Sequence, residues 1–164
     1  MPPAARLGDP VSHPLPPVIT GGPTAITVII GGQPAWRGVN PAVAAAMQAA
    51  KAISDAAIKT AEAATVAAAG TPGAPAAKAA EELVKAGAAA AMGSAISAAA
   101  GGSDIHACAT PLPIPPHGPG IVITPSATVM VANFPAARQG DTILEAVGPP
   151  NKISVGCVTV LIGG

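Results

Sequence analysis

The chain has 164 residues and a formal net charge of zero, with 10% charged residues, one Trp, one Phe and no Tyr. This composition excludes an aromatic core and a nucleic-acid surface in which basic residues alternate with aromatic ones. The length suits one domain with an interior of Val, Ile, Leu and Ala, so we expect stability to need a further source, such as close backbone packing, a partner or a metal ion.

The first 37 residues are rich in Pro, Gly and β-branched residues, and they open without the apolar segment of a signal peptide. Their first motif is PAARLGDPVSH at residues 3–13, which ends in His13. The run AITVIIGG at 25–32 predicts a short strand that ends in a turn, and PAWR follows at 34–37. We therefore expect short strands joined by tight turns, in a protein that starts in the cytoplasm.

Residues 38–102 are dominated by alanine and predict an inserted α-helical hairpin. Asn40-Pro41 is typical of a helix start, with asparagine as N-cap and proline in the first turn. GTPGAP at 70–75 separates this helix from a second one, expected from about Pro75 to Ala100. Polar residues at spacings of three and four predict an exposed stripe on each helix: Gln48, Lys51, Asp55, Lys59 and Glu62, then Lys78, Glu81, Glu82 and Lys85.

This pattern favours a soluble hairpin whose two helices pack on each other. A docking surface for a cargo protein is the sharper alternative. A membrane-acting segment is a third, but the longest uncharged stretch, Ala86 to Ser103, is weakly apolar and short for a bilayer span.

Residues 103–164 return to the composition of the first segment. Strands are predicted at ATVMVANF (127–134) and CVTVLIGG (157–164), and PAARQGD at 135–141 repeats the opening motif. The sequence therefore indicates three copies of one unit, at 3–33, 34–133 and 135–164, each with a proline–alanine motif. The middle copy carries the insertion. In that copy GVNP stands where the other two continue with Gly-Asp.

All three histidines, His13, His106 and His117, lie outside the alanine-rich segment. Cys108 follows His106 by two residues, so both side chains can point to one side of an extended strand, and His117 comes after a proline-rich stretch. Three imidazoles and a thiolate suit a closed tetrahedral Zn²⁺ site. By spacing alone, solvated histidines and a buried apolar cysteine are the competing interpretation.

Cys157 is the rival thiol. It begins an apolar strand run, which favours a core cysteine. A disulfide between Cys108 and Cys157 is possible by number, but free thiols or a metal ligand fit a cytosolic start better. The third copy runs TILEAVGPP, in which we predict no metal ligand before Cys157.

Taken together, these motifs resemble the PAAR-repeat proteins, the spike tips of type VI secretion systems and related contractile injection machines. The carriers are PAARLGDPVSH, PAWR, PAARQGD, DIHACATPLPIPPHG, VGPPNKISVGCVTVLIGG and the recurring Gly-Gly strand ends, which cover nearly all of 1–37 and 103–164. PAWR and the alanine-rich insertion depart from the family pattern, so the resemblance implies no role for residues 38–102.

The resemblance implies a mainly β fold, a small pseudo-threefold cone formed by 1–37 and 103–164, with 38–102 as the inserted hairpin. It implies one structural Zn²⁺, with iron as the less favoured metal, held by His13, His106, Cys108 and His117. Arg6, Arg37 and Arg138 would occupy equivalent corners that lock the cone or face the spike. We also expect that the protein is not an enzyme.

The implied function is to cap a trimeric VgrG-like spike, one chain per trimer, and to sharpen it for membrane puncture. The partners would be that spike, an effector or chaperone on the hairpin, and transiently the target membrane, with no nucleic acid. The protein would reside in the bacterial cytoplasm before assembly and leave at the spike tip on firing.

Two alternatives remain. A zinc-dependent hydrolase would need an open metal position and a base. Without Cys108 the three histidines would leave such a position, and Asp9 or Asp104 would be the nearest acids by sequence. Both aspartates stand in Gly/Pro turns, where capping of backbone amides is their ordinary role. The other alternative is a membrane-acting effector that uses the alanine-rich helices.

Overall fold

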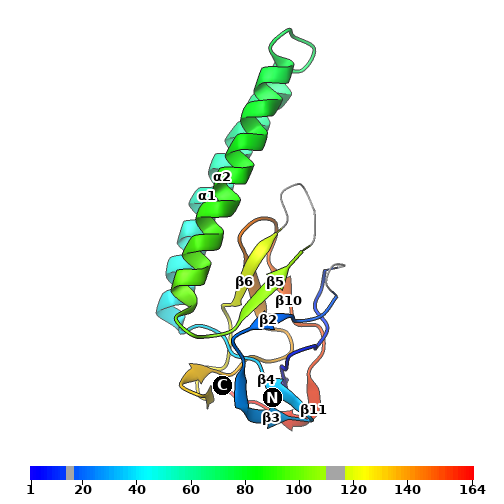
Figure 1. Ribbon diagram of the computed structural model, residues 1–164, viewed down its shortest axis with the longest axis vertical. Coiled ribbons are helices and arrows are strands. Elements are labelled where there is room, and N and C mark those ends of the chain that lie inside the picture. Colours follow the sequence, from blue (N-terminus) through cyan, green and yellow to red (C-terminus); the bar gives the residue numbers. More distant parts are fainter. Residues whose placement is uncertain (14–16, 110–116) are drawn as a thin grey trace.

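The computed structural model describes residues 1–13, 17–109 and 117–164, in which a helical hairpin accompanies small antiparallel sheets. Figure 1 shows the hairpin along one side of the strands and projecting beyond them, with both termini at the opposite end. The helices are α1 (Pro41–Ala68) and α2 (Ala74–Ala100). The strands are β1 (Pro3–Ala4), β2 (Gly21–Gly22), β3 (Ala25–Ile30), β4 (Gln33–Ala35), β5 (Ile105–Cys108), β6 (Gly118–Val122), β7 (Met130–Val131), β8 (Phe134–Pro135), β9 (Thr142–Glu145), β10 (Asn151–Lys152) and β11 (Cys157–Leu161).

Helices make up 36% of the structure and strands 29%, so the protein is a mixed α and β protein. The predicted mainly β class therefore holds only for the segments on either side of the hairpin, which we call the β part. The reason is the size of the insertion, because helices of 28 and 27 residues outweigh strands of two to six residues. The predicted helical hairpin itself is present.

One end of the β part, which we call the base, consists of three two-stranded sheets: β1–β11, β3–β4 and β7–β8. Each sheet pairs the proline of a repeated motif with a large apolar residue. The pairs are Pro3 with Leu161, Pro34 with Ile29, and Pro135 with Met130. The same register in three separate sheets confirms that the sequence repeat is also a structural repeat.

The third residues of the motifs, Ala5, Trp36 and Ala137, close a ring of backbone hydrogen bonds. Ala5 donates to Ala137, Ala137 to Trp36, and Trp36 to Ala5, each with 2.9 Å between nitrogen and oxygen. All three residues are at most 1% exposed. The ring pairs buried backbone groups across the three copies, and it relates the copies to one another in cyclic, approximately threefold order.

The arginine that ends each motif is held by an aspartate of the same copy. In every case the arginine backbone amide donates to the aspartate Oδ2, and the guanidinium contacts the same carboxylate. The pairs are Arg6 with Asp9, Arg37 with Asp104, and Arg138 with Asp141. The hairpin therefore interrupts the middle motif between its arginine and its aspartate. The aspartate that GVNP lacks returns after the insertion, as Asp104.

The pair in the third copy is the loosest of the three. The Arg138 Nη2 atom lies 3.3 Å from Asp141 Oδ1, against 2.7 and 2.8 Å for the corresponding ion pairs of Arg6 and Arg37. Asp141 is nevertheless buried, and its desolvation raises the pKa of this carboxyl to about 6.

This raised pKa predicts an unusual pH dependence. Between pH 3.8 and about 6 the folded protein binds more protons at Asp141 than the unfolded chain does, so rising pH reduces the free energy of unfolding across that window. Asp141→Asn keeps an acceptor for the Arg138 amide and removes the titration. Urea unfolding at pH 4, 5 and 6 should show the wild type losing stability relative to this variant. Parallel pH profiles would contradict the prediction.

Local signals in the sequence explain both ends of the hairpin. Asn40 Oδ1 accepts a hydrogen bond from the Val43 amide at 3.0 Å, and Pro41 occupies the first turn of α1, as predicted. Gly101 ends α2 in the left-handed conformation, with φ of 56°, which glycine adopts without strain. At its lower end the hairpin packs on β6 and β9, where Met92 and Ile96 join the same apolar cluster as Ile121.

The predicted exposed stripes are present only in part. Gln48, Lys59, Lys78 and Glu82 are exposed, and Asp55 and Glu62 are half-buried, but the other three residues are not exposed. Lys51, Glu81 and Lys85 are buried, at 5 to 7% exposure. Lys85 bridges the two helices, with its Nζ atom 2.7 Å from Glu62 Oε1 and 2.6 Å from Glu81 Oε1. Helices with many alanines approach closely, so these long side chains lie along the interface and pair there.

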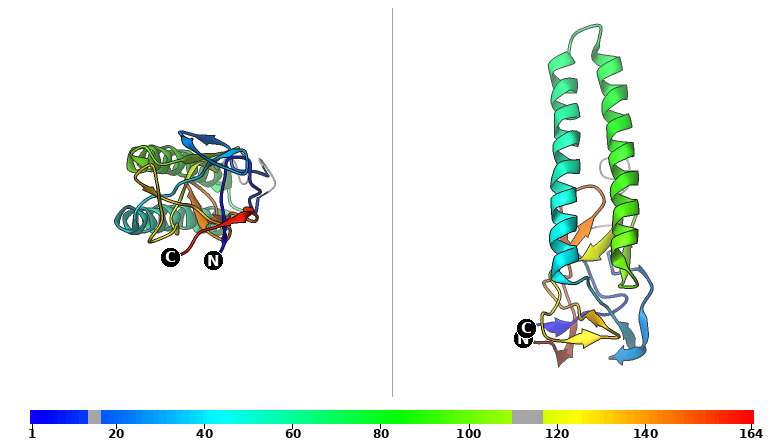
Figure 2. Two further views of the ribbon diagram at one scale, coloured as in Figure 1. Left: turned by 90° about the horizontal axis from the view of Figure 1, so that it is seen from below. Right: turned by 90° about the vertical axis from the view of Figure 1, so that its left-hand side faces the viewer.

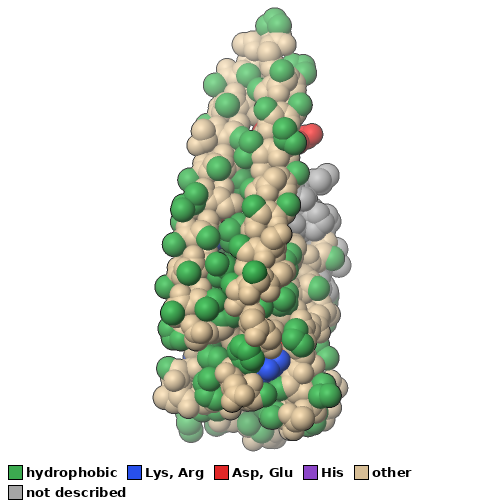
Figure 3. Space-filling model, turned by 60° about the vertical axis from the view of Figure 1, so that its left-hand side comes forward, with side chains coloured by type: hydrophobic (Ala, Val, Ile, Leu, Met, Phe, Trp, Pro, Cys, Tyr) green, Lys and Arg blue, Asp and Glu red, His purple; other side chains and the backbone are tan. Residues whose placement is uncertain are grey.

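The outward face of the hairpin carries almost no charge (Figure 3). A shallow apolar groove of about 510 Å³ runs between the helices. It is lined by Ala50, Ile53, Ser54, Ala57, Val84, Gly87, Ala88, Ala91, Met92 and Ala95. By length and composition α2 is apolar enough to cross a membrane, and only 22% of its apolar window is buried.

Candidate metal centre

A five-stranded antiparallel sheet, in the order β10–β9–β6–β5–β2, brings the candidate ligands together. His106 on β5 and Glu145 on β9 both lie opposite Gly120 of the intervening strand β6. A Cβ atom at Gly120 would stand 2.9 Å from Glu145 Cγ, so the glycine leaves room for the glutamate side chain. Cys108 lies two residues beyond His106 on β5, and therefore on the same face of the sheet.

Four buried side chains converge at this point: His13, His106, Cys108 and Glu145, whose donor atoms all lie within 4.8 Å of one another. The Nε2 atoms of His13 and His106 are 2.9 Å apart. Glu145 Oε1 lies 3.3 Å from the first of these atoms and 3.8 Å from the second. Three of the four predicted metal ligands thus belong to this set, and the fourth position is taken by a residue that sequence analysis missed.

His117, the remaining predicted ligand, lies beside the cluster. Its Nδ1 atom is 2.7 Å from Glu145 Oε2, and its ring centroid is 6.5 Å from that of His13. The other side of the ring faces Gly148, where a Cβ atom would stand 2.7 Å from Nε2. The predicted proline-rich stretch before His117 lies at 110–116, outside the described residues.

The sequence analysis expects no ligand from the third copy before Cys157, yet Glu145 of that copy lies in the cluster. A signal for it was present in the sequence. In the strand TILEAV the glutamate is the one charged residue among apolar neighbours, and a buried charge requires a partner or a metal. The buried position of Glu145, with 0% exposure, is that case.

Burial keeps the histidines of this cluster neutral. Desolvation lowers the pKa of His106 to about 4 and also lowers the pKa of His13. Both imidazoles are therefore unprotonated at neutral pH, which is the form that binds metal ions.

The donor set fits a metal ion. Two imidazoles, one thiolate and one carboxylate are all ligands that Zn²⁺ accepts in closed four-coordinate sites. Glu145 Oε1 is buried and has no hydrogen-bond partner among the described residues. An unsatisfied buried carboxylate oxygen is costly, and a cation at this point would satisfy it. The cluster can therefore hold a metal ion.

Cys157 lies elsewhere, in an apolar cluster at the base with Ala4, Ala25 and Ile30. Its Sγ atom contacts Thr159 Oγ1 at 3.2 Å. No disulfide joins the two cysteines. This placement agrees with the interpretation of Cys157 as a core residue and of Cys108 as the thiol near the histidines.

The two aspartates that a hydrolase would use are bound to arginines. Asp9 accepts from Arg6, and Asp104 accepts from both the backbone and the guanidinium of Arg37. Neither aspartate belongs to the cluster of four.

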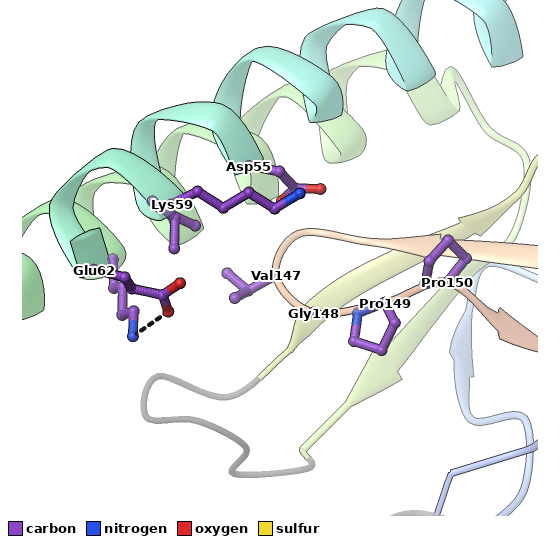
Figure 4. A pocket seen from close by; sticks show the side chains of 9 residues that line it. Asp55, Lys59, Glu62, Val147, Gly148, Pro149 and Pro150 are labelled. Carbon is purple, nitrogen blue, oxygen red and sulfur yellow. Dashed lines mark ion pairs between the residues drawn. The ribbon is translucent and has the colours of Figure 1, made fainter. Parts of the chain in front are cut away.

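A second cavity, of about 340 Å³, separates the hairpin from the loop 147–150 (Figure 4). Asp55, Lys59 and Glu62 project from α1 toward Val147 and the two prolines that follow Gly148. Its charged groups are of both signs, and the Glu62–Lys85 ion pair lies in its wall. We interpret the cavity as the seam between the hairpin and the β part.

Comparison of the chain with protein-family models, with curated proteins and with solved structures finds no significant match. The functional argument therefore depends on the residues and the geometry described above.

Proposed function

We propose that this protein is a metal-stabilised tip that caps a threefold-symmetric spike, in the manner of the PAAR-repeat proteins that its motifs resemble. The spike would be the trimeric VgrG-like protein of a contractile injection machine. The protein would act without catalysis, by giving the spike a sharp, rigid end for membrane puncture. It would assemble in the bacterial cytoplasm and leave the cell on firing.

The observation that carries the proposal is the apolar base. Three residues at equivalent positions of the three copies, Ile29, Met130 and Leu161, are 55%, 55% and 52% exposed. Ile26 and Val158, also equivalent to each other, are more exposed still, at 75% and 73%. Figure 2 shows this end of the molecule from below, with the strands of the base arranged around it. Exposed large apolar residues grouped at one end of a soluble protein mark an interaction surface.

The threefold arrangement suggests what covers this surface. A trimer presents three identical patches around its axis, and a single chain can match all three only if it repeats its own contact surface three times. The repeat of proline–apolar pairs at the base meets that condition. Docking would also cover short edge strands that otherwise invite aggregation. One chain per spike trimer follows from this symmetry.

The test is binding to the purified trimeric spike of such a machine. Leu161→Asp and Ile29→Asp should each weaken binding about 10-fold or more, because each removes an apolar contact of roughly 1.5–3 kcal/mol. Leu83→Asp on α2 is a matched control, since Leu83 is 76% exposed but lies far from the base. Native mass spectrometry should find one chain per three spike subunits. Equal binding by all three variants would contradict the proposal.

We assign the binding of cargo to the hairpin. An effector or a chaperone with an apolar helix would complete a three-helix arrangement in the uncharged groove between α1 and α2. Lys85 pairs with Glu62 and Glu81, and the groove is lined by uncharged residues.

A membrane-acting effector is the second candidate, and the apolar character of α2 favours it. Against it stands the packing of Met92 and Ile96 into the core shared with the β part. Release of dye from liposomes would support that candidate. A zinc-dependent hydrolase is disfavoured because Arg6 and Arg37 hold the aspartates that would serve as bases.

A further inference from the structure

We propose that Glu145 is a direct metal ligand and that His117 is a positioning residue that holds its carboxylate. The ligand set would then be His13, His106, Cys108 and Glu145. This inference depends on the metal-stabilised part of the proposed function and is independent of the spike.

The threefold order of the chain is the first argument. Asp9, Asp104 and Asp141 are equivalent, because each accepts from the backbone amide of its motif's arginine. The residue four positions after each aspartate is therefore equivalent as well. Those three residues are His13, Cys108 and Glu145. Each copy thus sends one side chain with a metal-binding atom to the same point, and Glu145 is the contribution of the third copy.

The distances are the second argument. Around a tetrahedral zinc ion with bonds of about 2.0–2.3 Å, neighbouring donor atoms stand roughly 3.3–3.6 Å apart. Glu145 Oε1 lies 3.3 Å from His13 Nε2 and 3.8 Å from His106 Nε2. The same oxygen is the one without a hydrogen-bond partner among the described residues.

The two carboxylate oxygens of Glu145 contact different groups. Oε2 is engaged by His117 Nδ1 at 2.7 Å, while Oε1 faces the other two histidines. A hydrogen bond of this kind orients a carboxylate ligand from the outer shell of a metal site. Because Gly148 has no side chain, the His117 ring can pack against it and still reach Glu145.

Charge balance is the third argument. Glu145 is 0% exposed, so its carboxylate needs a positive charge close by. A divalent cation in contact with this carboxylate and with the Cys108 thiolate would leave the site with no net charge.

The experiment compares Glu145→Gln with His117→Gln, each measured for zinc affinity by competition with a chromogenic chelator. We expect Glu145→Gln to lose more than about 100-fold in affinity, and His117→Gln to lose about 10- to 100-fold, as outer-shell partners do. Zinc X-ray absorption should report two imidazoles, one sulfur and one oxygen in the wild type. It should report two imidazoles in His117→Gln as well.

Several outcomes would overturn the inference. A wild-type spectrum with three imidazoles, one of which disappears in His117→Gln, would make His117 the ligand. A larger affinity loss in His117→Gln than in Glu145→Gln would do the same. If the wild type binds no zinc, the proposed metal site is refuted. The spike-binding assay with Leu161→Asp would still test the docking proposal separately. If Glu145→Gln does not fold, the wild-type zinc X-ray absorption spectrum still tests the inference, because it distinguishes two imidazoles and one oxygen from three imidazoles.

Discussion

Purified protein is expected to contain about one zinc ion per chain, and removal of that ion is expected to be the most destabilising single change. The β part has short strands and only one tryptophan and one phenylalanine, so its apolar core is small for its size. A structural zinc ion contributes roughly 10 kcal/mol of apparent binding free energy in small domains, and that energy appears as folding free energy. Chelation should therefore lower the melting temperature by more than about 10 °C.

The two cysteines give this prediction a matched control. Cys108→Ser should lose the metal and reproduce the low melting temperature of the chelated protein. Cys157→Ser should keep about one zinc ion per chain, because Cys157 lies in the apolar cluster of the base and not among the four converging ligands. Metal content by atomic emission and melting by circular dichroism measure both effects. Loss of zinc from Cys157→Ser alone would refute the choice of thiol.

Asp104→Ala is expected to be the most destabilising substitution outside the metal cluster. Asp104 is 0% exposed, and its carboxylate accepts from the backbone amide and from two guanidinium nitrogens of Arg37. Arg37 is itself 5% exposed and stacks over Phe134, with 5.1 Å from its Cζ atom to the ring centroid. Removing one partner leaves a buried guanidinium without its counter-ion, which typically costs about 3–5 kcal/mol.

The repeat supplies the comparison for this substitution. Asp9→Ala removes the equivalent carboxylate, but the side chain of Arg6 is 21% exposed against 6% for Arg37, so water can replace part of the lost interaction. We expect Asp9→Ala to lose clearly less free energy of unfolding than Asp104→Ala in urea titrations. Asp104 also joins the end of the hairpin to the β part. Equal losses in the two variants would show that burial of the pair does not determine its contribution.

Elements that depend on local signals are predicted from the amino-acid sequence. The Asn40 cap, the glycine at 101 and the alanine-rich run between them define the hairpin. The β-branched runs at 25–32, 127–134 and 157–164 predict strands, and the structure places these strands in the three small sheets of the base. Three of the four ligands predicted from composition and spacing, His13, His106 and Cys108, are indeed in the buried cluster. The ends of the hairpin and the single strands depend on residues that are close together in the chain, whereas the candidate ligands are identified by their residue type.

The completion of the middle copy and the acid that joins the cluster become visible only in the folded chain. Asp104 is separated from Arg37 by the whole hairpin, so no local pattern relates it to Asp9 and Asp141. Glu145 reaches His106 across β6 because Gly120 stands between them, and that register exists only after the sheet has formed. Lys85 and Glu81 are buried because the two helices pack on each other, which is also a tertiary contact. Helix spacing predicts a polar stripe, but the stripe's environment depends on what packs against it.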